Sequence, residues 1–486
     1  MENKQPTYEE ALAYTNTNSK PTDLKITDMR VTELSGAPYP CIMLKLYTNQ
    51  GIVGYGEVRD MASKTYALML KSRILGENPC NIDLIFHRIK QFGFNGRQGG
   101  GVSGIEMACW DIAGKAYGIP VYQMLGGKFR DKMRIYCDTD ADITEDRSEG
   151  QAMGEALKKR LEKGYTLLKM DLGIGLLRNK PGMLCAPLGY FDEMDELARK
   201  AESMAPNAWV FGPAADEANR KLRANGGNNE YVIDAMAARN RLVDAQNRLH
   251  PFTGVQITKR GLDYLESYVR DVRSIIGYDV PLALDHFGKI GVEEIIKLSH
   301  RLEDYNIAWM EDPIASCHFD QWKRLVNSTN IPICTGEDIY LAEKFIPLLD
   351  NGLSIVHPDA LTTGGLLEVK KLGDLAERYG ARMVLHQAAT PIHAMAAAHV
   401  GIATYNCWGC EFHANDVPWW SDLVKNSPLP NPIIQNGFIT VPDAPGFGIA
   451  ELNEDLIAEK VSIRNPGVWE DTSSWNLETS ADGVYN

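Results

Sequence analysis

The chain has 486 residues, of which 44% are hydrophobic, and its formal net charge is −14 at pH 7. A chain of this length can bury large cores and predicts roughly two or three structural units. The negative charge argues against nucleic acid or an anionic membrane as a partner, because both need a basic surface, but it allows an anionic small molecule held by a few local charges.

The N-terminal part begins with a polar stretch, residues 1–20, that lacks the apolar core of a signal peptide, and no later run has the length of a membrane span. We therefore expect a cytoplasmic protein. The sequence next alternates as antiparallel strands do, which predicts a meander. Its expected strands are 28–34, 41–47 and 52–56. A capping box at Ser103–Glu106 then predicts a helix with one buried face and a stop at Gly118.

From Lys132 onward, short apolar runs alternate with helical patterns such as the stripe from Leu262 to Ile276. This alternation predicts α/β architecture with a closed, TIM-like parallel (β/α) barrel, whose C-terminal rim carries the chemistry. The eight candidate strands are 133–137, 166–170, 282–285, 307–311, 333–337, 354–359, 382–386 and 403–407.

The segment 172–259 does not fit this repeat and is predicted to be an insertion after the second strand, with a helical run around Tyr231 to Arg248. Because it leaves from the rim, we expect it to cover the pocket or to form an oligomer contact, with the first slightly favoured. The predicted organisation is an N-terminal unit at 1–131, the barrel at 132–418, and a tail at 419–486 that folds back onto the N-terminal unit.

Three acidic residues, Asp285, Glu311 and Glu337, each close an apolar run at intervals of 26 residues (311 − 285 and 337 − 311). Equivalent ends of neighbouring barrel strands point to one place, where three carboxylates repel one another unless a hard divalent cation binds between them. The pattern therefore predicts a Mg²⁺ site. Any one of these residues alone fits a helix cap or a solvated loop better.

Asp359 and His386 end two neighbouring strands 27 residues apart. A carboxylate on one nitrogen of an imidazole fixes its tautomer and makes the other nitrogen more basic, as a general base near neutral pH requires. The alternative is a histidine that only caps a loop.

Several motifs together carry a family likeness. They are 105–112 with Leu125–Gly127, the strand ends Asp285, Glu311–Pro313 and Gly336–Asp338, and Pro442–Gly448. With these motifs the chain resembles the mandelate racemase and muconate lactonising subgroup of the enolase superfamily, and in particular its galactonate-type acid-sugar dehydratases. The resemblance covers nearly the whole chain apart from the insertion. It implies an α+β capping domain, formed by the N- and C-terminal segments, over a modified barrel. It also implies Mg²⁺ on the three acids, abstraction of the proton α to a carboxylate, and a homo-oligomer.

The same resemblance suggests further site residues. Lys169 matches the first lysine of the family's Lys-x-Lys motif, whereas Asp171 replaces the second. Lys169 is expected to pair with the substrate carboxylate or to stabilise the ene-diolate, unless it binds a neighbouring metal ligand. Glu411 is expected to hydrogen-bond the substrate carboxylate, unless it lies in a surface loop. His286 resembles the acid for the leaving hydroxyl, but one position early, so it faces away from the pocket unless the backbone twists.

The loss of the second lysine weakens racemisation, which needs groups on both faces of the carbanion. A syn elimination can instead use His386 both to take the α proton and to protonate the departing hydroxyl. We therefore predict a Mg²⁺-dependent dehydratase that converts a small sugar acid to a 2-keto-3-deoxy acid. An epimerase or cycloisomerase using Lys169 and His386 is the alternative, and an inactive barrel acting as a binding protein is another. The sequence does not name the sugar.

Overall fold

The computed structural model describes most of the chain, and it forms two compact units. The described residues are 19–142, 146–186, 189–204, 255–288, 290–462 and 465–479, with isolated positions between 224 and 240. The helical run expected around Tyr231 to Arg248 lies outside them apart from those isolated positions. The first unit comprises 1–136, 336–346 and 356–486, and the second comprises 137–335 and 347–355.

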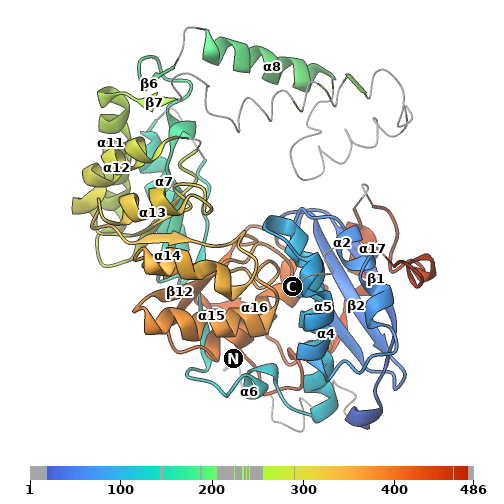
Figure 1. Cartoon of the computed structure of the whole chain (residues 1–486). Helices are drawn as coiled ribbons and strands as arrows, with labels where there is room; N and C mark the ends of the chain where they lie inside the picture. Colours follow the sequence, from blue (N-terminus) through green and yellow to red (C-terminus); the bar gives the residue numbers. More distant parts are fainter. Residues whose placement is uncertain are drawn as a thin grey trace. The chain divides into compact units, whose positions relative to one another are not determined.

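The first unit contains the predicted meander as a separate three-stranded antiparallel sheet in the order β1-β2-β3. The strands are β1 (Ile26–Leu34), β2 (Cys41–Thr48) and β3 (Val53–Val58). Figure 1 shows this sheet in blue with helix α5 (Gly100–Tyr117) along it. The shorter helices of this part are α2 (Thr65–Leu68), α3 (Lys71–Ile74), α4 (Ile82–Ile89) and α6 (Val121–Met124).

Helix α5 differs from its prediction at the N-terminus and agrees at the C-terminus. It starts at Gly100, so Ser103 is not a cap: its hydroxyl donates to the carbonyl of Gly99 at 3.0 Å. Glycine lets the helix approach β3, since a Cβ on Gly104 would lie 2.5 Å from the carbonyl oxygen of Glu57. The helix is consequently buried on all sides rather than on one face. It ends at Gly118, whose φ of 72° is left-handed, as the sequence predicted.

Eight strands form the predicted barrel sheet. They hydrogen-bond in the order β13-β12-β11-β10-β9-β8-β5-β4, and β13 also pairs with β4, which closes the sheet. The fold is therefore a (β/α) barrel accompanied by a separate antiparallel sheet. The strands are β4 (Lys132–Cys137), β5 (Leu168–Asp171), β8 (Leu282–Asp285), β9 (Ile307–Glu311), β10 (Ile333–Thr335), β11 (Ile355–Val356), β12 (Arg382–Leu385) and β13 (Cys407–Phe412).

The eighth strand was predicted at 403–407 but lies at Cys407–Phe412. Helix α16 (Pro391–Ile402) is buried along its whole length, and Ala403 is its C-cap. A short apolar run at the end of a buried helix has no polar face, so its pattern resembles that of a buried strand. The correction places Glu411 inside the strand rather than in the loop after it.

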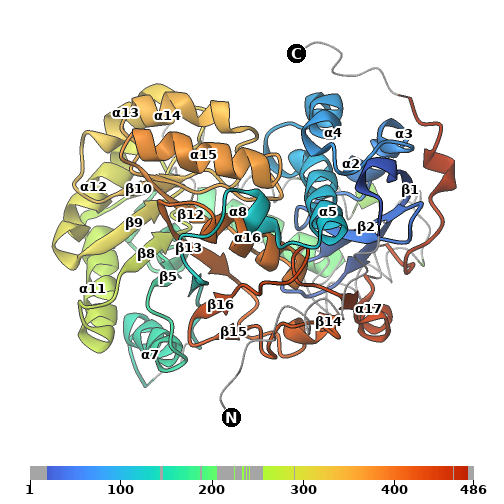
Figure 2. The same ribbon diagram turned by 90° about the horizontal axis from the view of Figure 1, so that it is seen from below.

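Helices cover the outer side of the strands within each unit. In the second unit, α11, α12 and α13 lie outside β8 and β9 (Figure 2). These helices, with α7 and α14, have the bounds α7 (Glu149–Glu162), α11 (Lys259–Ile276), α12 (Val292–Leu302), α13 (Phe319–Val326) and α14 (Ile346–Asp350). In the first unit, α15 (Leu366–Arg378) packs against α16 and β12. Helix α11 ends at Gly277, as predicted.

The segment predicted as an insertion contains a two-stranded antiparallel ribbon of β6 (Leu184–Cys185) and β7 (Gln256–Ile257). Helix α8 (Tyr190–Met204) follows β6. The pairing holds Leu184 next to Ile257 and Cys185 next to Gln256.

The C-terminal segment contacts strand β1 and helix α5 within the first unit. The backbone N–H of Ser462 donates to the carbonyl of Glu33 at 2.7 Å, and that of Phe447 donates to Asp111 Oδ1 at 3.0 Å. Its elements are β14 (Val424–Lys425), β15 (Ile434–Gln435), β16 (Phe438–Thr440), β17 (Glu451–Leu452) and α17 (Glu454–Lys460). Among the described residues, the helices lack the length and apolar content needed to cross a membrane.

Candidate active site

In the second unit, a buried lysine joins two of the predicted metal ligands. Lys169 Nζ in β5 lies 2.6 Å from Oδ2 of Asp285, the last residue of β8, and 2.5 Å from Oε1 of Glu311, the last residue of β9. Trp309 donates its indole N–H to the other oxygen of Glu311 at 2.8 Å. One ammonium neutralises only one of the two carboxylates, so this group of residues keeps a net negative charge among oxygen donors. Such a donor set fits a hard divalent cation.

The third predicted metal ligand, Glu337, belongs to the first unit. It follows Gly336, which has a φ of +140° that favours glycine. A Cβ added to Gly336 would lie 2.4 Å from the Phe345 ring. Oε1 of Glu337 lies 3.3 Å from Nη2 of Arg59, and Oε2 lies 3.1 Å from Nε2 of His386. Because the three acids are divided between the units, their joint coordination of one ion stays a prediction.

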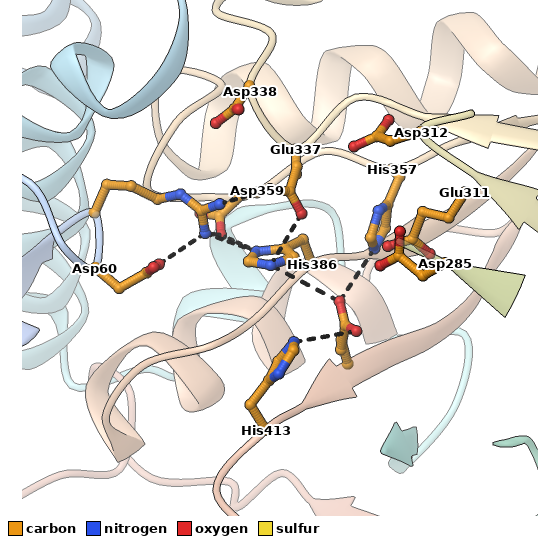
Figure 3. Close-up of polar contacts among 12 residues, drawn as sticks. Asp60, Asp285, Glu311, Asp312, Glu337, Asp338, His357, Asp359, His386 and His413 are labelled. Carbon is orange, nitrogen blue, oxygen red and sulfur yellow. Dashed lines mark hydrogen bonds and ion pairs between the residues drawn. The ribbon is translucent and has the colours of Figure 1, made fainter. Parts of the chain in front are cut away.

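The structure brings the predicted base and its carboxylate together. Asp359 and His386 form a parallel backbone bridge, and Nδ1 of His386 lies 2.6 Å from Oδ2 of Asp359 (Figure 3). Burial raises the pKa of Asp359 to about 7, and the charge of Arg59 opposes that rise. The pair has the geometry in which a carboxylate orients an imidazole, while its catalytic role stays a prediction.

Arg59 is a site residue for which the sequence predicted no contact. Its fully buried guanidinium lies next to Asp60 (2.8 Å) and Asp359 (2.5 Å), and its Nη1 is 2.7 Å from Nδ1 of His386. Two adjacent charged residues directly after the apolar strand β3 were the available signal. Their partners lie about 300 residues away in the sequence, so local pattern did not reveal the contact.

Glu411 is buried in β13, with 1% of its surface exposed, which excludes the surface-loop alternative. Its carboxylate faces three imidazoles: His413 at 3.2 Å, His357 at 3.6 Å and His386 at 3.9 Å. In Figure 3, dashed lines join His413, His357 and His386 to this carboxylate, which is drawn without a label. No role was predicted for His413 from the sequence.

His286 has a left-handed backbone, with a φ of 53°, directly after the end of β8. Its Nδ1 lies 2.9 Å from Oδ1 of Asp171 and 3.5 Å from Oδ2 of Asp285. The hydrogen bond with Asp171 raises the pKa of His286 to about 10. The twist that the sequence left open is therefore present. Both side chains are more than half exposed, and their place in substrate binding stays a prediction.

Within single units, the described residues include two groups whose possible metal-ligand atoms all lie within 4.8 Å of one another. One contains His386, Glu411 and His413, and the other contains Asp138, Asp171 and His286.

Comparison with known proteins shows the family. Residues 14–126 match the family model described as mandelate racemase/muconate lactonizing enzyme, N-terminal domain, and residues 235–456 match the model described as enolase C-terminal domain-like. The chain is 30% identical over 448 residues to the D-xylonate dehydratase of Haloferax volcanii, with 90% of each chain covered. The chain belongs to the mandelate racemase/muconate lactonising family of the enolase superfamily.

Other members of the enolase superfamily agree in sequence and in fold. The D-galactonate dehydratase of Ralstonia pickettii is 26% identical over 465 residues, covering 91% of this chain and 97% of that protein. The crystal structure of a mandelate racemase/muconate lactonizing enzyme-like protein from Rubrobacter xylanophilus superposes with a TM-score of 0.70 at 24% identity, covering 91% and 99% of the two chains. These findings confirm the resemblance and the fold, and the dehydratase relatives make this superfamily member an enzyme of the hydro-lyase class.

Proposed function

We propose that this superfamily member is a Mg²⁺-dependent acid-sugar dehydratase that removes the proton α to a carboxylate and eliminates the β-hydroxyl. The observation that carries the proposal is the buried pair of His386 and Asp359, joined at 2.6 Å, in a chain whose relatives are named dehydratases of xylonate and galactonate. An imidazole held in one tautomer is suited to proton transfer near neutral pH.

Asp285, Glu311 and Glu337 would hold the magnesium ion, since they offer only oxygen donors, two at the ends of β8 and β9 and one shortly after β10. When bound, Mg²⁺ would stabilise the negative charge that develops on the substrate carboxylate as the α proton leaves. Lys169 holds two of these carboxylates in place through its contacts at 2.6 and 2.5 Å.

The proton transfers are assigned to His386. Nε2 takes the α proton, and the electron pair of the broken C–H bond moves onto the substrate carboxylate. That electron pair then returns to form the C=C bond between the α and β carbons as the β C–O bond breaks. The same Nε2 then gives its proton to the departing hydroxyl, which leaves as water. The resulting enol becomes a 2-keto-3-deoxy acid by tautomerisation. Glu411, buried beside His386, would hydrogen-bond the substrate carboxylate, and His286 would contact the sugar hydroxyls.

Elimination is favoured over epimerisation or cycloisomerisation by the contacts of Lys169. Its ammonium donates to two buried carboxylates, and ionised carboxylates only accept hydrogen bonds. Lys169 is therefore held in its protonated form, which makes it a poor second base on the opposite face of the substrate. The location in the cytoplasm and assembly into a homo-oligomer are further expectations, and size-exclusion chromatography with light scattering tests the second.

The test is a panel of aldonates, including xylonate and galactonate, incubated with the purified protein and Mg²⁺ in D₂O. We expect a 2-keto acid from at least one of them and loss of the activity with a chelator. Deuterium at the α carbon of unchanged acid, without any keto product, would identify an isomerase instead. No reaction with any acid, together with no Mg²⁺ binding, would support the inactive binding protein.

A further inference from the structure

The carboxylate of Glu411 lies between two imidazoles of the first unit. Nε2 of His413 is 3.2 Å from Oε1, and Nε2 of His386 is 3.9 Å from Oε2 (Figure 3). The two rings are tilted by 50° with their centres 5.8 Å apart. One possible ligand atom from each of the three side chains can be chosen so that all three lie within 4.8 Å of one another.

These separations match those between the ligands of one small metal ion. Zn–N and Zn–O bonds of about 2.0–2.1 Å at tetrahedral angles place ligand atoms about 3.3 Å apart. The observed N···O separations of 3.2 and 3.9 Å lie on either side of that value. Small side-chain rotations would therefore complete the coordination. The site is also buried, with Glu411 fully inside and the side chain of His413 only 10% exposed.

We propose that His386, Glu411 and His413 form a second metal site, selective for a borderline divalent ion such as Zn²⁺, whose occupancy inhibits the enzyme. Two imidazole nitrogens and one carboxylate suit Zn²⁺, whereas Mg²⁺ prefers oxygen ligands and water. Three protein ligands leave a fourth position open for water.

The inhibition follows because one of the three ligands is His386, the proposed base, and it therefore rests on the proposed function. Nε2 of His386 is the atom assigned to take the α proton, and an imidazole that gives this lone pair to a metal has none left for a proton. Zinc binding itself requires no catalytic role of His386, so the site and the function can be tested separately.

Glu337 is the other carboxylate close to the same nitrogen, with Oε2 at 3.1 Å from Nε2 of His386. Glu337 is also a proposed magnesium ligand, so zinc titrations need saturating Mg²⁺ throughout. Under that condition a zinc ion at the acidic triad must displace Mg²⁺, whereas one at the histidine site need not.

The experiment is calorimetric titration of the full-length, metal-stripped protein with Zn²⁺ in saturating Mg²⁺. We expect one tight zinc ion per chain. His413→Gln should weaken its binding by about 100-fold or more, because even an outer partner of a zinc ligand is worth 10- to 100-fold. Glu311→Gln alters the magnesium site and should leave the tight zinc ion in place. His87→Gln removes an exposed histidine paired with Asp83 at 3.2 Å and controls for surface binding.

Cobalt(II) gives an independent readout, since its visible absorption reports imidazole coordination. We expect these bands in the wild-type protein and their loss in His413→Gln, with circular dichroism confirming that the variant is folded. Equal zinc affinity in wild type and His413→Gln would overturn the proposal, as would loss of zinc binding in Glu311→Gln alone. If the protein turns over a sugar acid and added zinc does not change the rate, the inhibition is overturned and the proposed function is retained. Tight zinc binding without turnover of any acid would retain the second metal site and overturn the proposed function together with the inhibition.

Discussion

Nη1 of Arg59 lies 2.7 Å from Nδ1 of His386, the same nitrogen that lies 2.6 Å from Oδ2 of Asp359. A guanidinium only donates and a carboxylate only accepts, so Nδ1 can hydrogen-bond with one of them at a time. When Nδ1 carries the proton and donates it to Asp359, Nε2 keeps the lone pair that a base needs. Arg59 remains paired with Asp359 and Asp60, and it thereby holds the carboxylate that selects this tautomer.

Replacing Arg59 should separate charge from geometry. Arg59→Met leaves Asp60 and Asp359 as buried, uncompensated charges, which should cost about 3–5 kcal/mol of unfolding free energy. Arg59→Lys keeps the charge but not the planar fork, so it should be less destabilising while kcat falls about 10- to 100-fold. Denaturant unfolding and steady-state kinetics measure the two effects. Equal kcat in Arg59→Lys and wild type would show that Arg59 does not position the pair.

His386→Asn should remove proton abstraction. We expect kcat to fall by about 10²–10⁴-fold, the usual contribution of a positioned acid or base, together with loss of deuterium exchange at the α carbon. Exchange followed by mass spectrometry distinguishes a lost base from slow product release. His87→Gln, at an exposed helix position, serves as the control and should retain wild-type kinetics. A His386→Asn enzyme that still exchanges the α proton at the wild-type rate would require another base.

Lys169→Met should make the protein more dependent on a divalent ion. Without the ammonium, Asp285 and Glu311 repel each other in a buried site, so metal-free stability falls. A bound cation then relieves more repulsion than in the wild type, and added Mg²⁺ should raise the melting temperature by roughly 5 °C more than in the wild type. Thermal unfolding with Mg²⁺ or with a chelator measures this difference.

The matched control for Lys169→Met is Lys259→Met, which removes an exposed lysine paired with Asp263 at 2.7 Å. Its response to Mg²⁺ should equal that of the wild type, because exposed pairs contribute little. If Mg²⁺ stabilised Lys169→Met no more than this control, Asp285 and Glu311 would not be metal ligands.

The sequence predicted the barrel because its strands and helices alternate at a regular spacing, a signal that is local and repeated. The same spacing placed Asp285, Glu311, Asp359 and His386 at strand ends, where the structure has them. Strand alternation also made the orientation of His286 depend on one backbone angle, which sequence pattern does not report.

What the sequence did not predict depends on contacts between distant segments. The start of α5 is set by close packing against β3 at Gly104, which overrides the capping signal at Ser103. The last barrel strand was misplaced because a helix buried on all sides has no periodic polar face. The contact of Arg59 with Asp359 joins residues 300 apart, and no local pattern encodes such a pair.

Glu57 should make stability depend on pH. Its carboxyl is fully buried and accepts hydrogen bonds from the hydroxyl and the backbone N–H of Thr390. Asp60 and Cys41 are its other ionisable neighbours. Burial raises the pKa of Glu57 from 4.5 to about 8. Between these two pH values the folded protein holds a proton that the unfolded chain has lost, so the free energy of unfolding decreases as pH rises through that window. The decrease should be on the order of a few kcal/mol. Glu57→Gln imitates the protonated group and should flatten the pH profile, which denaturant unfolding at several pH values would measure. Parallel profiles for the two proteins would mean that Glu57 stays ionised in the fold.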